Sequence, residues 1–149
     1  MNSENLDNLI HEWFRRSVGK WTSQRRYLFN MKEKTPTNLT TEFTIAPHMD
    51  GEFDYQVVWT GQTQGTMNLK LSGNELHRDI GYFTEDPTIS YLSMVDADTL
   101  VMSTSYGGST FREEIRFLKD DGLRLRQTIG YSDKTGQPIL VGQYYEERL

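Results

Sequence analysis

The chain has 149 residues, and its 16 Lys and Arg against 21 Asp and Glu give a formal net charge of −5. This length suits one domain with one core, and the acidic balance disfavours nucleic acid, because phosphate binding needs a concentrated basic surface. The absence of cysteine excludes a disulfide framework, a thiolate metal site and a cysteine nucleophile, and it favours a reducing, cytoplasmic compartment.

Residues 3–17 form the first periodic segment. The apolar residues of this segment recur at the spacing of an amphipathic helix, and they are Leu6, Leu9, Ile10, Trp13 and Phe14. Gly19 can end the helix. The polar start contains neither a basic leader nor an apolar one, and the chain has no apolar run of about 18 residues. We therefore expect no secretion signal and no membrane span.

After Gly19 the apolar pattern changes to the alternation of β-strands, and about ten short runs follow, separated by turn signals such as MDGE, LSGN and KDDG. No helical pattern lies between the runs, so neighbouring strands should be antiparallel. The sequence predicts a mainly β protein with an antiparallel up-and-down β-barrel of about ten strands. The barrel should span about residues 20–149, with the N-terminal helix at one end or side, in a single domain of residues 1–149.

The common catalytic motifs are absent. The chain has no GxGxxG, no P-loop, no GxSxG and no HExxH, and His11, His48 and His77 are scattered without the spacing of metal ligands. We therefore expect neither a metal site nor a resident cofactor.

Charged residues alternate within three of the strand-like runs. The residues that share a face within each run are Arg112, Glu114 and Arg116, then Arg124, Arg126 and Thr128, then Tyr144, Glu146 and Arg148. Short connections pair these runs, so all three polar faces can lie on the same side of one sheet. That side is either a solvated outer surface or the lining of a ligand cavity. Two arginines about 7 Å apart could bind two carboxylates of one ligand.

The segment SVGKWTSQRRY, residues 17–27, resembles the G-K-W-x-S-Q-R signature of the S/U-type phycobiliprotein lyases, which are lipocalin-like chromophore lyases of cyanobacteria and related phototrophs. The segments VVWTG, TSYGGSTFREEIRFL, LRLRQTIGY and VGQYYEERL also resemble that family, so the likeness covers nearly the whole chain. The resemblance implies a lipocalin-like barrel that binds a bilin, a linear tetrapyrrole such as phycocyanobilin with two propionates, and promotes its thioether attachment to a cysteine of a phycobiliprotein subunit.

The resemblance also implies roles for particular residues. By spacing in the motifs, Arg25, Glu114, Arg124 and Glu146 match positions of the family pattern, and Glu114 and Arg124 are the expected catalytic residues. The other expected ligand contacts are Arg25, Trp59, Arg112, Arg126, Tyr144, Glu146 and Arg148. For Trp59, a place in the cavity wall and a place in the core are equally favoured. On this reading, Arg124→Ala weakens bilin binding with little loss of fold.

The segment SQRRYL, residues 23–28, looks closer to the U-type branch of the family. This implies a heterodimer with an S-type lyase subunit, with a homodimer as a further possibility, and phycobiliprotein apo-subunits as the acceptors. The alternative function is that of a non-catalytic, lipocalin-like carrier of an acidic apolar ligand, for which the same arginines would bind a carboxylate.

Overall fold

The N-terminal segment forms one amphipathic helix, α1 (Ser3–Ser17), in a computed structural model that describes residues 3–29, 31, 35–80 and 84–149. Its apolar stripe is buried through Ile10, Trp13 and Phe14, and the predicted bounds of 3–17 are confirmed. Its last turn carries Arg15 and Arg16, whose charges favour the negative end of the helix. No helix in the described part of the chain is long and apolar enough to cross a membrane.

The rest of the described chain forms ten strands. They are β1 (Gly19–Phe29), β2 (Thr37–Pro47), β3 (Tyr55–Gly61), β4 (Gly65–Ser72), β5 (Glu75–Arg78), β6 (Thr88–Asp96), β7 (Thr99–Tyr106), β8 (Ser109–Leu118), β9 (Leu123–Ser132) and β10 (Pro138–Arg148). Each expected run contains one strand. The alternating run ELHRDIGYF, residues 75–83, is one of the ten, but it is a strand only as far as Arg78, and residues 81–83 lie outside the described residues.

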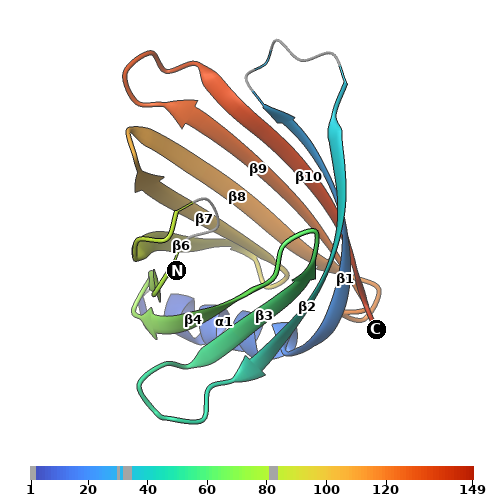
Figure 1. Cartoon of the computed structure of the whole chain (residues 1–149). Helices are drawn as coiled ribbons and strands as arrows, with labels where there is room; N and C mark the ends of the chain where they lie inside the picture. Colours follow the sequence, from blue (N-terminus) through green and yellow to red (C-terminus); the bar gives the residue numbers. More distant parts are fainter. Residues whose placement is uncertain (1–2, 30, 32–34, 81–83) are drawn as a thin grey trace.

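The strands close into an antiparallel up-and-down barrel, as predicted (Figure 1). Consecutive strands are neighbours, and β1 pairs with β2 on one side and with β10 on the other. The β1–β10 ladder runs from Trp21 opposite Arg148 to Phe29 opposite Leu140. Closure satisfies the backbone hydrogen bonds that an open sheet would leave at its edges.

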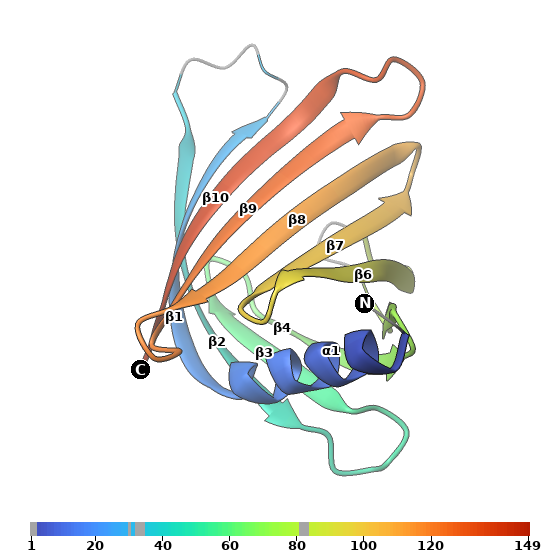
Figure 2. The ribbon, with the colours of Figure 1, turned by 180° about the vertical axis from the view of Figure 1, so that it is seen from behind.

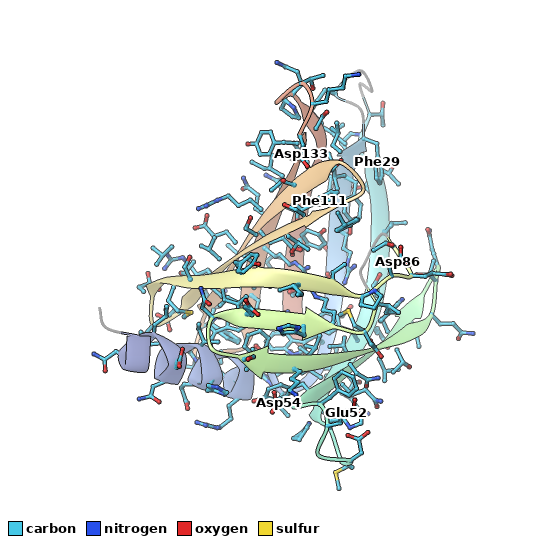
Figure 3. All side chains as sticks on the ribbon, turned by 90° about the vertical axis from the view of Figure 1, so that its left-hand side faces the viewer. Phe29, Glu52, Asp54, Asp86, Phe111 and Asp133 are labelled. Atoms are coloured by element: carbon cyan, nitrogen blue, oxygen red, sulfur yellow. The ribbon has the colours of Figure 1, made fainter. Side chains whose placement is uncertain are left out.

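The helix lies across one end of the barrel and closes it (Figure 2). At this end Trp13 packs against Phe117, Trp21 stacks with Phe43, and all four side chains are buried in the main core. A second, smaller cluster contains Tyr27, Leu140 and Tyr144 with the partly buried Phe111. Figure 3 shows that Phe29 and Phe111 lie toward the end of the barrel away from α1.

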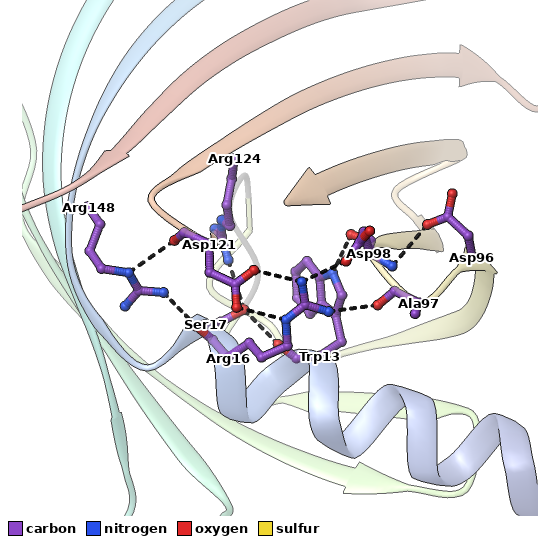
Figure 4. Close-up of polar contacts among 9 residues, drawn as sticks. All are labelled: Trp13, Arg16, Ser17, Asp96, Ala97, Asp98, Asp121, Arg124 and Arg148. Carbon is purple, nitrogen blue, oxygen red and sulfur yellow. Dashed lines mark hydrogen bonds and ion pairs between the residues drawn. The ribbon is translucent and has the colours of Figure 1, made fainter. Parts of the chain in front are cut away.

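Ion pairs and hydrogen bonds fasten the helix to two turns of the barrel (Figure 4). Arg16 donates from Nε to Asp121 at 2.9 Å, and from Nη2 to Asp121 and Asp98, both at 2.7 Å. Arg148 donates to the carbonyls of Arg16 and Val18, both at 2.7 Å, at the end of the helix, and to that of Asp121 at 3.1 Å. The hydrogen bonds and the charge of Asp121 raise the pKa of Arg16. These contacts fix α1 as the floor of the barrel.

Candidate functional site

The barrel encloses a cavity of about 750 Å³. Its apolar wall includes Phe43, Ile45, Val57, Trp59, Met67, Leu69, Leu76, Met102 and Ile115, and α1 contributes Trp13 and Phe14. Its polar wall includes Arg25, Arg78, Glu113, Arg124, Arg126 and Tyr144. This volume falls within the usual range for small-molecule sites, in which a mostly apolar wall carries a few oriented polar groups.

Arg124 is buried at the floor of this cavity. Its Nε and Nη2 donate to Oε1 of Glu146 at 3.1 and 2.8 Å, and its Nη1 donates to Oγ of Ser17 at 3.1 Å. The guanidinium also lies 4.9 Å from the ring centroid of Trp21 and 5.5 Å from that of Trp13. Arg124 on β9 thus connects the helix with β10. Three of the N–H groups of its guanidinium are already donated to Glu146 and Ser17, which leaves fewer for a ligand.

Glu146 lies behind Arg124 and does not border the cavity. Its side chain is fully buried, and Oε2 has no hydrogen-bond partner among the described residues. Burial opposes ionisation, but the positive charges of Arg124 and Arg126 and the hydrogen bond from Arg124 outweigh it, so the pKa of Glu146 is lowered. Glu146 is therefore a charged group that binds Arg124 from outside the cavity lining.

A second ion pair lies higher in the cavity. Arg126 donates from Nε to Oε2 of Glu113 at 2.8 Å, and its Nη2 pairs with the same oxygen. The guanidinium lies 4.7 Å from the ring centroid of Tyr144, whose hydroxyl accepts from Thr128 at 3.4 Å. Burial raises the pKa of Tyr144 well above its ordinary value, so the hydroxyl stays protonated. All of these residues except Thr128 border the cavity.

Arg25 on β1 also borders the cavity. Its Nε donates to Oγ of Ser23 at 3.1 Å, and its guanidinium lies 5.2 Å from the ring centroid of Tyr144. Within the part of the chain that the structure describes, it makes no ion pair with a carboxylate. Its two terminal nitrogens make no hydrogen bond to a described carboxylate, so they could bind the carboxylate of a ligand.

The sequence reasoning missed Arg78, Glu113 and Ser17. Arg78 on β5 is buried in the opposite wall, where it donates to Oγ of Ser90 at 2.8 Å and lies 3.5 Å from Sδ of Met102. Arg78 lies two positions after the apolar Leu76, so both share one face of the strand, and this spacing is the signal that could have placed Arg78 on the inner face. Ser17 gives no comparable signal, because its contact with Arg124 joins residues far apart in the sequence.

One expectation about the strand faces is wrong. The register pairs Phe117 with Arg124, Ile115 with Arg126 and Glu113 with Thr128, so Arg112 and Glu114 lie on the opposite, outer face of β8. Both side chains are exposed, and neither borders the cavity. Glu114 instead borders a groove of about 680 Å³ on the outer surface. The carboxylate that β8 presents to the cavity is that of Glu113.

The remaining expected contacts divide between the cavity and its surroundings. Trp59, Arg126 and Tyr144 border the cavity. Arg148 does not, because its guanidinium binds the carbonyls at the helix end and lies 4.3 Å from the Trp21 ring centroid. No group of three or more His, Asp or Glu side chains in the described ranges is arranged to hold a metal ion.

A closed antiparallel barrel with one end covered by a helix, and with arginines and aromatic rings around an internal cavity, is a lipocalin-like barrel. The chain belongs to the CpeS-like protein family, whose model matches residues 65–149.

Two similar proteins come from cyanobacteria. One is a protein of Picosynechococcus sp. that bears the name chromophore lyase CpcV, which is 27% identical over 92% of this chain and 80% of its own length. The other is a protein of Nostoc sp. that bears the name phycocyanobilin lyase CpcS 2, which is 28% identical over 96% of this chain and 92% of its own.

A solved structure has the same fold. The S-type phycobiliprotein lyase CPES from Guillardia theta superposes with a TM-score of 0.75 at 20% identity, over 94% of this chain and 92% of that one. This likeness confirms the predicted barrel with its N-terminal helix.

Proposed function

We propose that this protein binds a bilin non-covalently inside the barrel and promotes its thioether attachment to a cysteine of a phycobiliprotein subunit. The observation that carries the proposal is the cavity itself, which combines a largely apolar wall with Arg25, an arginine that makes no ion pair with a described carboxylate. A linear tetrapyrrole with two propionates needs an apolar enclosure for its conjugated rings and cations for its acids. The names of the cyanobacterial relatives support the same function.

Each polar residue of the cavity then has a definite task. Arg25 binds a propionate, while Arg126 and Glu113 stay paired and present a carboxylate that accepts hydrogen bonds from pyrrole N–H groups. Arg124, oriented by Glu146 and Ser17, provides positive charge at the floor. These residues hold one extended pose of a flexible ligand, and positioning of this kind can supply much of a rate enhancement.

The reaction itself is an addition. The sulfur of the acceptor cysteine bonds to the exocyclic carbon of the terminal ring, the carbon–carbon double bond is consumed, and the thiol proton passes to the tetrapyrrole. The exocyclic carbon is more electrophilic in the protonated, cationic form of the tetrapyrrole, which a neighbouring carboxylate stabilises, and Glu113 is the carboxylate in place for this. This chain has no cysteine, so it cannot trap the bilin itself.

The reconstitution that tests the proposal contains the purified protein, phycocyanobilin and an apo-phycobiliprotein. The covalent adduct is followed by its absorbance and by zinc-stained gels. We expect faster formation of one stereochemically uniform adduct than in the mixture without this protein. Bilin binding without faster or cleaner attachment would instead establish the non-catalytic carrier.

We further propose that the chain acts in the cytoplasm, stands nearer the U-type branch, and works with an S-type lyase subunit. The motif SQRRYL supports the branch, and the absence of cysteine supports the compartment. The same reconstitution, repeated with an S-type subunit, should give more adduct than either lyase alone, and the two should elute together in size-exclusion chromatography. Unchanged yield and elution would remove the heterodimer from the proposal.

A further inference from the structure

Among the described residues of the barrel wall, an aromatic ring lies on a glycine of the neighbouring strand at three places. Each ring and its glycine are directly opposite in the strand register, and the pairs are Trp59 with Gly65, Phe111 with Gly130, and Tyr27 with Gly142. None of these glycines has a φ in the left-handed region. Any residue could adopt their backbone conformation. Glycine is required because the aromatic ring occupies the space that a Cβ atom would take.

The contact at Gly65 is the tightest of the three. A Cβ added there would lie 2.3 Å from Cζ2 of Trp59 and 2.8 Å from Cε2 and Cη2. Carbon atoms do not approach so closely without contact repulsion, since optimal separations are about 3.5–4.0 Å. The β3–β4 ladder pairs both residues and holds their backbones, so the indole ring is the part that must move.

This pair forms part of the cavity wall. Trp59 and Gly65 both border the cavity, together with Thr63 and Gln64 of the loop that joins β3 to β4. By contrast, neither Phe111 nor Gly130 borders it. The angle at which the indole lies on β4 therefore determines how much of the cavity a ligand can fill at this place.

We propose that Gly65 is a positioning residue that keeps Trp59 flat against the barrel wall, and so sets the width of the cavity for a planar ligand. The proposal deepens the proposed function and rests on it for the identity of that ligand. Any side chain at position 65 tilts the indole off the wall, which narrows the cavity and removes the flat face on which a conjugated ring can stack.

The test compares Gly65→Ala with Gly130→Ala. The control is closely matched, because a Cβ at Gly130 meets Cε1 and Cδ1 of Phe111 at 2.7 and 2.8 Å, away from the cavity. Titration with phycocyanobilin, followed by absorbance, should show at least a tenfold weaker affinity and an altered bound spectrum for Gly65→Ala. Gly130→Ala should bind as the wild type does.

A ligand-free measurement separates this inference from the proposed function. Trp13 and Trp21 are 2% and 0% exposed, so acrylamide quenching of tryptophan fluorescence reports mainly on the half-buried Trp59. Gly65→Ala should quench more steeply than the wild type. Titration with 8-anilinonaphthalene-1-sulfonate measures the capacity of the cavity without a bilin, and it should fall in Gly65→Ala alone.

A double-mutant cycle with Trp59→Ala completes the test. In that background Gly65→Ala should change neither ligand affinity nor folding, because the ring it displaces is gone. If Gly65→Ala alone fails to fold, the double variant should fold as Trp59→Ala does. Wild-type quenching and affinity in Gly65→Ala, an equal loss in Gly130→Ala, or a loss that persists without Trp59 would each overturn the proposal.

Discussion

Replacement of Arg124 by Met tests the floor of the barrel most directly. The change keeps a long side chain but removes the cation, which leaves the fully buried Glu146 without the partner that donates to its Oε1. Removal of one member of a buried ion pair costs about 3–5 kcal/mol. The nearby charges of Arg126 and Arg25 also favour the ionised form of Glu146, so we expect the lower end, about 3 kcal/mol.

Urea unfolding followed by tryptophan fluorescence measures this loss. With a slope of about 2 kcal/mol per molar urea, a loss of about 3 kcal/mol lowers the midpoint by roughly 1.5 M. The double variant Arg124→Met/Glu146→Leu removes both charges and should recover most of the stability. Arg112→Ala on the exposed face of β8 is the control, and it should stay within about 0.5 kcal/mol of the wild type.

The pH dependence gives an independent check of the same pair. The pKa of Glu146 in the folded state lies below its ordinary value of 4.5, so its ionised form stabilises the fold above that pH, and this contribution is lost as the pH falls through the lowered pKa. Glu146→Gln should therefore flatten the acid limb of the stability curve. An Arg124→Met variant as stable as the wild type, with an unchanged acid limb, would refute the reasoning.

Three further predictions concern the cavity and the ion pair between Arg16 of α1 and Asp121. Arg25→Ala should weaken bilin binding by about 1.5–3 kcal/mol, the value of a charged hydrogen bond, while the urea midpoint stays unchanged; equal affinity in the titration would place the propionate elsewhere. Glu113→Gln should slow bilin transfer and shift the bound absorbance, whereas Glu114→Gln on the outer face should alter neither, and the reverse result would reassign the carboxylate. The hydrogen bond from Arg16 lowers the pKa of Asp121, so the ionised carboxylate stabilises the fold, and this contribution is lost as the pH falls below about 3.8. Asp121→Asn lacks this contribution, so its melting temperature should fall less than that of the wild type on acidification. An unchanged dependence of the melting temperature on pH would contradict this reasoning.

The number of strands and the helix bounds could be predicted because they depend on local patterns. The helical spacing of Ile10, Trp13 and Phe14 and the alternation in residues 123–132 each reflect a single face, and a face can be read within one element. Turn residues then marked nearly every strand end. The pairing of Arg124 and Arg126 with Glu146 and Tyr144 on one face also followed, since the register of β9 and β10 places them opposite each other.

The face of β8 could not be assigned in the same way, because it depends on the length of one turn. Four residues, 119–122, separate the paired Leu118 and Leu123, so even-numbered residues of β8 lie opposite odd-numbered residues of β9. A turn with one residue more or fewer would have placed Glu114 inside. The apolar neighbours of Glu113, namely Ile115 and Phe117, were the available signal, since a face with large apolar residues is normally the inner one.

The structural role of Arg124 was beyond the sequence for a different reason. Its partner Ser17 lies 107 positions away at the end of the helix, and no local pattern predicts that contact. The expectation that Arg124 can be removed with little loss of fold therefore gives way to a predicted loss of stability. Arg148 was similar, because its alternation matched that of a ligand contact while its partners are carbonyls at the end of α1.

The ladder between β1 and β10 has a consequence for how the protein is made. The residues that it pairs are far apart in the sequence. The separation is 111 positions for Phe29 and Leu140, and it rises to 127 positions for Trp21 and Arg148. Contacts between such distant segments slow folding, because the loop must close before the contacts can stabilise it. A nascent chain that lacks β10 exposes the unpaired edges of β1 and β9, which are templates for wrong strand pairing. We therefore expect the yield of folded protein to rise when synthesis is slowed by low temperature or when chaperones that shield such edges are abundant.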